Sequence, residues 1–241
     1  MTTDHRTQFR GLPRATDLFR WGENSLAGLT LLLMAGLPVV EIVLRVLFNT
    51  GIPASSTYVQ NLTLWVGFSR AVLAARDDGH LTFFLGRDLF PQGTHNYCVV
   101  LIAMVSTTVA ASLSWAALDF VRADMQSPVV VAGWLPTWAV EAILPASFAV
   151  IALHFATKPE TALTRLFAFL GIPVAAGIGL FLPMHSPEFL WMALFILFLA
   201  AVLGTPIFII LGGGTLLLFQ VEGTTAAAIP VEAYRLVVSP S

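Results

Sequence analysis

Four ionisable residues stand inside long apolar stretches of the chain and are the first candidates for chemistry. They are Glu41, Arg45, Arg70 and Glu141. A bare charge at the centre of a bilayer costs about 2.5–3.5 kcal/mol even on lenient scales, so such residues usually have partners. Glu41 and Arg45 are four residues apart, which places them on one face of a helix in the favourable order. The charges therefore indicate either a proton or ion relay or a set of contacts that fix helix register and packing.

The packing interpretation is favoured because a relay needs acidic groups on neighbouring helices, and this chain has few of them in its apolar stretches. Arg70 lies toward one end of its stretch, where its long side chain can reach the membrane surface. We therefore expect these charges to hold a helix bundle together.

Histidine suggests a second chemistry, the ligation of a b-type haem between facing helices. His154 is the only histidine inside a predicted membrane span. The other histidines fall in loops or in the N-terminal arm: His5, His80, His95 and His185. A bis-histidine haem therefore lacks a second well-placed ligand, and no cofactor is expected. The membrane anchor subunit of a redox complex, or another non-transport assembly protein of the membrane, is kept as the alternative function.

Motifs of soluble catalysis are absent from the sequence. It contains no nucleophile–histidine–acid arrangement and no metal-ligand spacing. The glycine run at 212–214 precedes no Lys-Ser/Thr pair and so is not a phosphate-binding loop. The single cysteine, Cys98, allows neither an internal disulfide nor a cysteine-based metal site. We expect no enzymatic activity and no bound metal.

The composition places these residues in a membrane. The 241 residues are 57% hydrophobic and only 11% Asp, Glu, Lys and Arg, against about 25% charged residues in soluble domains. The mean hydropathy is +0.83. Too few polar residues remain to cover a soluble globule of this length. The net charge of −2 gives no basic surface for nucleic acid.

The apolar residues form continuous segments, which favour helices over the alternating strands of a barrel. A helix crosses the hydrocarbon core with about 20 apolar residues. The sequence therefore predicts an all-α integral membrane protein with about six transmembrane helices. They are expected at 25–48, 58–75, 96–118, 134–156, 166–182 and from about 189 to a point before 222. The last stretch contains Gly204 and Pro206 and is either one long broken helix or a helix followed by a re-entrant turn.

Charges in the loops predict the orientation. The arm at 1–22 holds four arginines, whereas the loop at 49–57 has no charge. By the positive-inside rule, this pattern favours a cytoplasmic N-terminus and an even number of spans. The arm is either a short amphipathic helix on the inner leaflet or a disordered basic segment. It lacks the features of a cleaved signal peptide.

Three stretches together resemble one family of membrane proteins. The first is Glu41–Phe48 at the end of the first predicted span. The second contains Trp65, Phe68 and Arg76, followed by His80. The third begins at Trp134, contains Trp138 and continues through Pro145 to Phe148. In order and spacing they resemble the small membrane subunit, Q, of the tripartite ATP-independent periplasmic (TRAP) transporters.

The likeness extends beyond a free Q subunit. Residues 23–157 are similar to a four-helix Q domain, and 158–187 to the linker helix found where Q is fused to the large permease subunit, M. Residues 188–241, with Leu203-Gly204-Thr205-Pro206-Ile207, resemble the start of M. The resemblance implies a Q–M fusion that is represented here up to its first M-like helix.

The resemblance also implies a role and partners. TRAP systems sit in the bacterial inner membrane and import organic acids, which a periplasmic substrate-binding protein delivers and a sodium gradient drives inward. The M-type permease carries the substrate and sodium sites, and Q is a static scaffold. We therefore assign no catalytic, cofactor-binding or metal-binding residues. The loops at 49–57 and 119–133 are expected to meet the binding protein.

Overall fold

The computed structural model describes residues 15–77, 95–127, 129–131, 135–159, 161–181 and 187–238. The helices in these ranges are α1 (Ala15–Phe48), α2 (Ser55–Arg76), α3 (His95–Gln126), α4 (Thr137–Glu141), α5 (Ile143–Thr157), α6 (Ala162–Phe169), α7 (Gly171–Phe181), α8 (Pro187–Leu203), α9 (Ile207–Val221) and α10 (Ala228–Val238). Two short strands, β1 (Val130–Val131) and β2 (Leu135–Pro136), pair antiparallel. The predicted all-α membrane fold is confirmed.

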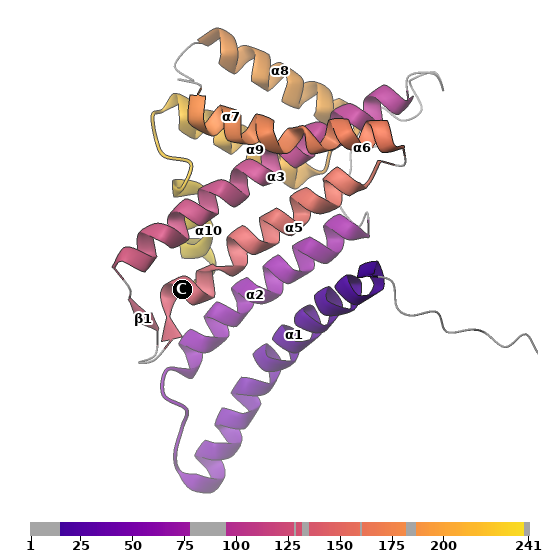
Figure 1. Cartoon of the computed structure of the whole chain (residues 1–241). Coiled ribbons are helices and arrows are strands. Elements are labelled where there is room, and N and C mark those ends of the chain that lie inside the picture. Colours follow the sequence, from indigo (N-terminus) through magenta and orange to yellow (C-terminus); the bar gives the residue numbers. More distant parts are fainter. Residues whose placement is uncertain are drawn as a thin grey trace, which may run out of the picture.

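A layer of helices forms in the order α1, α2, α5, α3 (Figure 1). The segments Asp17–Phe48, Tyr97–Gln126 and Thr137–Thr157 are each long and apolar enough to cross a membrane. The layer is held by two apolar clusters. One joins α2, α3, α5 and α9 around Ala110, Ile151 and Ile209. The other joins α2, α3 and α5 around Leu64 and Leu144.

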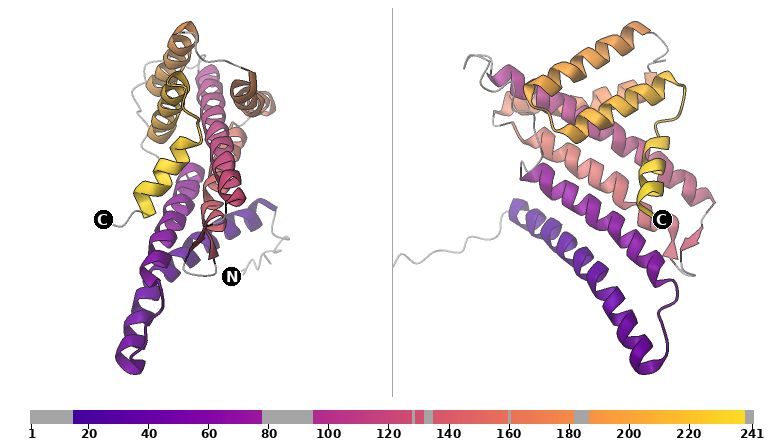
Figure 2. Two further views of the ribbon diagram at one scale, coloured as in Figure 1. Left: turned by 90° about the vertical axis from the view of Figure 1, so that its left-hand side faces the viewer. Right: turned by 180° about the vertical axis from the view of Figure 1, so that it is seen from behind.

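Helix α3 is the centre of the molecule, because it contacts α4, α5, α6, α7, α8, α9 and α10. Glycine allows two of these helices to approach it closely. A Cβ at Gly171 would lie 2.8 Å from the carbonyl oxygen of Met104, and one at Gly212 would lie 2.9 Å from the side chain of Leu113. In Figure 2, α7 lies on one side of α3 and the α8–α9 pair on the other.

Proline divides two of the predicted spans into unequal pieces. The span expected at 134–156 becomes α4 and α5 around Ala142. Pro145 has no N–H to donate to the carbonyl of Glu141, four residues earlier, which weakens the helix there. The span expected at 166–182 begins earlier, at Ala162, and is divided between α6 and α7. Pro173 cannot donate to Phe169, the last residue of α6.

The final apolar stretch forms two helices. Gly204 adopts a φ of 107°, a left-handed value that favours glycine, and Pro206 stands directly before α9. The hydroxyl of Thr205 donates to the carbonyl of Ala200 at 2.7 Å and satisfies one of the last carbonyls of α8. Helices α8 and α9 run back along one another in both views of Figure 2 and are in contact. The structure therefore favours a helical hairpin over a single bent helix.

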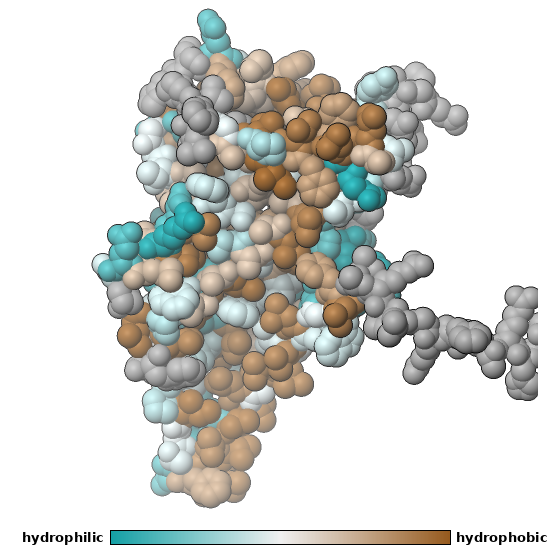
Figure 3. Space-filling view, in the orientation of Figure 1, coloured by the Kyte–Doolittle hydropathy of each residue, from teal (hydrophilic) through white to brown (hydrophobic). Residues whose placement is uncertain are grey.

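Helix α1 lies at the edge of the layer and packs mainly against α2. Many of its large apolar side chains are exposed, including Trp21 at 70% and Leu32 at 66%. Brown, hydrophobic atoms accordingly cover much of the lower part of Figure 3, where α1 and α2 lie. In a membrane, this surface faces lipid or another subunit.

Candidate functional site

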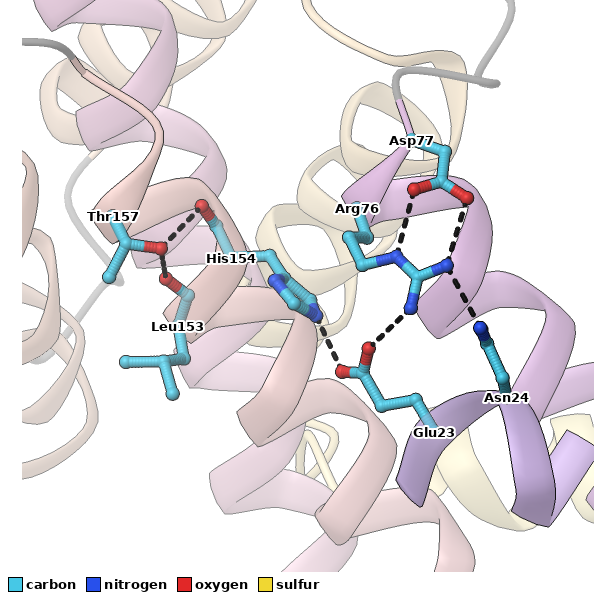
Figure 4. A network of polar contacts seen from close by, with 7 residues as sticks. All are labelled: Glu23, Asn24, Arg76, Asp77, Leu153, His154 and Thr157. Atoms are coloured by element: carbon cyan, nitrogen blue, oxygen red, sulfur yellow. Dashed lines mark hydrogen bonds and ion pairs between the residues drawn. The ribbon is translucent and has the colours of Figure 1, made fainter. Parts of the chain in front are cut away.

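Polar side chains from three helices meet at one end of the layer, where α1 begins and α2 and α5 end (Figure 4). We call this group the inner polar cluster, because the N-terminus is expected on the cytoplasmic side. Its members are Glu23 and Asn24 of α1, Arg76 and Asp77 at the end of α2, and His154 of α5.

Glu23 is the centre of this cluster. Its Oε2 accepts a hydrogen bond from Nη1 of Arg76 at 3.0 Å, and its Oε1 lies 2.7 Å from Nε2 of His154. The Glu23 side chain is only 9% exposed, and those of Arg76 and His154 are 12% and 16% exposed. One carboxylate therefore fastens α2 and α5 to α1. Such a buried carboxylate needs both partners to offset its lost hydration.

Arg76 distributes its remaining donors over two other residues. Its Nε and Nη2 donate to the two carboxylate oxygens of Asp77 at 2.8 and 3.0 Å, and Nη2 also donates to Oδ1 of Asn24 at 3.0 Å. The hydrogen bond from Arg76 lowers the pKa of Asp77, which lies just beyond the end of α2, below its ordinary value. The carboxylate is therefore charged at neutral pH and balances the guanidinium.

Sequence reasoning singled out Arg76 but missed Glu23. Glu23 precedes the stretch predicted as the first span, and its partners are 53 and 131 residues away along the chain. His154, the histidine considered for haem, has its Nε2 occupied by Glu23 and its ring 6.2 Å from that of Phe19. His80, the other family-like position at this end, lies outside the described residues.

The family-like aromatic residues meet at the interface of α2 with α4 and α5. Nε1 of Trp65 donates to the carbonyl oxygen of Val140 at 3.0 Å. The ring of Phe68 packs edge-on against that of Phe148, with centroids 5.4 Å apart. The Trp65 contact lies next to the α4–α5 break at Ala142, and the Phe68 contact lies further along α5.

Pro145 and Trp138 belong to the same broken segment. The carbonyl of Pro145 accepts a hydrogen bond from Oγ of Ser114 on α3 at 2.9 Å. Trp138 lies in α4, and its carbonyl accepts from the backbone N–H of Ala142 at 3.0 Å. Helices on both sides thus supply polar partners around the break, as is common for broken helices in membranes.

Replacing Trp65 with phenylalanine is expected to lower the free energy of unfolding by about 1 kcal/mol, because the indole hydrogen bond to Val140 is lost while most of the packing stays. Thermal unfolding in detergent measures this loss. Trp191→Phe is the matched control, since Trp191 is 70% exposed. Equal losses for the two variants would contradict a role of the Trp65 hydrogen bond.

The intramembrane charges lie at separate places. Glu41 accepts a hydrogen bond from the hydroxyl of Ser55 at the start of α2. No ion pair joins it to Arg45 in the part of the chain that the structure describes. Glu141 is 2% exposed, and its Oε2 has no hydrogen-bond partner among the described residues. Arg70 is exposed on α2. The four side chains do not form a continuous path.

A large apolar cavity lies apart from these charges. It has a volume of about 790 Å³ and is lined by α3, α7, α8 and α9 and by the segment just before α10. Leu101, Met192 and Leu216 are typical of its walls. Within the described ranges, no group of three or more His, Cys, Asp or Glu side chains is arranged to hold a metal ion.

The comparison with protein families gives one match. The model of the DctQ component of tripartite ATP-independent periplasmic transporters matches residues 34–165. No curated protein matches the chain. The matched region holds the α2 interface with α4 and α5, together with Arg76 and His154 of the inner polar cluster. Since the match covers more than half of the 241 residues, the chain belongs to the DctQ family, the small membrane component of TRAP transporters.

Proposed function

We propose that this chain is the static membrane scaffold of a TRAP transporter that imports organic acids. A sodium gradient drives the import, a periplasmic protein delivers the substrate and an M-type permease carries it across. The family match supports the transporter assignment. In this proposal the protein lies in the bacterial inner membrane with its N-terminus in the cytoplasm, and it catalyses no reaction.

The observation that carries the scaffold role is the inner polar cluster. Two basic side chains of different helices engage the Glu23 carboxylate, and all three side chains are largely buried. A charge relay needs ionisable groups in succession across the membrane. Here the cluster lies at one end of α1, α2 and α5, whereas Glu41 is bound to Ser55 at the opposite end of α1. This arrangement favours locked helices over ion passage.

The proposal includes a division of the chain. Residues 23–157 form the Q-like domain, 158–187 the linker and 188–241 the start of an M-like domain. The close approach of Gly171 in α7 and Gly212 in α9 to α3 supports it, because both later segments then share an interface with the Q-like bundle. In this proposal, α3 provides the surface against which the moving permease packs.

The outward loops are the proposed contact with the binding protein. The loop expected at 119–133 begins later than the sequence indicated, because α3 continues to Gln126. Both the backbone N–H and the hydroxyl of Thr137 donate to the carbonyl of Val129, at 2.9 and 2.8 Å. These bonds tie Val129, just before β1, to the first residue of α4 and support a defined docking surface at 129–131 and 135–137.

Reconstitution tests the proposed function. Proteoliposomes that contain this chain alone are expected to show no sodium-dependent uptake of organic acids, whereas uptake is expected when the cognate permease and binding protein are added. Uptake by this chain alone would contradict the scaffold role. Unchanged uptake after the chain is left out of the complete mixture would also contradict it. A Soret band in the purified protein would favour the redox alternative instead.

A further inference from the structure

Arg70 is a cation without an ionic partner inside the helix layer. It is exposed on α2, and no ion pair or hydrogen bond joins it to another described residue. It lies six residues, or about 9 Å, before Arg76, the last residue of α2. From there its long side chain can reach the membrane surface, where the anionic headgroups of lipids lie. The position therefore favours an anionic ligand from outside the described chain.

A groove lies beside this cation. It has a volume of about 370 Å³ and is lined by Asn24, Ala27, Gly28 and Leu31 of α1 and by Arg70 and Leu73 of α2. The contact of Asn24 with Arg76 sets the register of the two helices. Gly28 opens the groove, because no atom lies within 4 Å of a Cβ placed there.

The walls of the groove are chemically complementary to a phospholipid. Arg70 and Asn24 supply a cation and an amide donor, while Ala27, Leu31 and Leu73 supply apolar contact, and the lining contains no acidic side chain. Oδ1 of Asn24 accepts from Arg76, which leaves its Nδ2 as a donor. Arg20 is exposed one turn before Asn24 on α1 and adds a second positive charge near this end. A phosphate fits the polar part, and an acyl chain fits the apolar part.

A helix of a partner protein is the less favoured occupant. It would have to supply its own acidic residue next to Arg70, whereas an anionic phospholipid carries a phosphate. We propose that the groove between α1 and α2 binds one anionic phospholipid, with the phosphate on Arg70 and an acyl chain along Gly28 and Leu31.

The test uses the full chain in nanodiscs of phosphatidylcholine with a minor share of phosphatidylglycerol. Native mass spectrometry of the released protein counts the retained lipids. We expect about a fivefold preference for phosphatidylglycerol, which corresponds to about 1 kcal/mol for one arginine near the surface. Arg70→Gln is expected to abolish the preference, and Arg70→Lys to keep most of it.

Two glycine variants test the contribution of the groove separately from that of the Arg70 charge. Gly28→Leu places a side chain in the open groove and is expected to reduce lipid retention about as much as Arg70→Gln. Gly36→Leu is the matched control, since Gly36 also lies in α1 with open space at its Cβ but outside the groove. Equal retention of the two lipids by the unaltered chain would overturn the proposal. An undiminished preference in Arg70→Gln, or equal effects of the two glycine variants, would overturn it as well.

Discussion

Replacing Glu23 with glutamine is expected to lower the free energy of unfolding by about 3 kcal/mol, because the change leaves two largely buried basic groups without their carboxylate. Glu23 lies 3.0 Å from Arg76 and 2.7 Å from His154. Glutamine keeps the size of the side chain, so lost packing contributes little. The first helix should then separate from the second at its inner end before the rest of the bundle unfolds.

The measurement is the loss of folded protein with temperature or denaturant in detergent, followed by tryptophan fluorescence. The matched control is Glu232→Gln, which removes a carboxylate 3.1 Å from Arg235 on the exposed surface of α10. Those two side chains are 48% and 71% exposed, and surface pairs contribute about 0–1 kcal/mol. If both variants lose the same stability, the inner polar cluster does not hold the helices together.

A double-mutant cycle measures the coupling between Glu23 and His154. The losses of Glu23→Gln and His154→Gln are expected to be less than additive, because each variant removes the same 2.7 Å contact. Additive losses would show that the histidine stabilises the bundle independently of Glu23.

The second large effect is expected at Gly171. Its Cβ would lie 2.8 Å from a backbone oxygen of α3, 3.0 Å from Oγ1 of Thr108 and 3.1 Å from Cβ of Thr107. Gly171→Ala should therefore push α7 away from α3 and lower the free energy of unfolding by about 1–3 kcal/mol. The same substitution would weaken the contact of the proposed linker, residues 158–187, with α3.

Gly177→Ala is a control on the same helix. Nothing lies within 4 Å of a Cβ at Gly177, so alanine there is expected to stabilise the helix by about 0.5–1 kcal/mol. Thermal unfolding of the two variants, side by side, gives the difference. A stabilising effect of Gly171→Ala equal to that of Gly177→Ala would contradict the close packing of α7 on α3.

Sequence alone predicted much of the helical organisation, since the hydrocarbon core demands long uninterrupted apolar runs. Gly204 and Pro206 indicated the break in the last apolar stretch, because a missing N–H weakens a helix. Pro38, by contrast, stands inside the unbroken α1. Trp65 and Phe68 were singled out through the family pattern, and the structure places both at one interface.

The contacts that hold the helices together were beyond sequence reasoning. Glu23 and His154 are 131 residues apart, and nothing in the local pattern of either indicates the other. Glu41 was considered with Arg45 because of helical spacing, yet its carboxylate is bound by Ser55 of the next helix. Spacing along one helix describes which side chains share a face, whereas the packing of two helices decides which of them meet.

The length of α1 has a consequence for the surrounding bilayer. The segment Asp17–Phe48 has 32 residues and is therefore about 48 Å long, against a hydrocarbon thickness of about 30 Å. Its first turns carry Arg20, Glu23 and Asn24 and belong outside the hydrocarbon core. Any mismatch of the apolar remainder is relieved when the helix inclines or the lipids around it stretch, at fractions of a kcal/mol per Å. The angle of α1 should thus follow the acyl-chain length of the host membrane, which makes bilayer thickness a physical control on the shape of this edge of the protein.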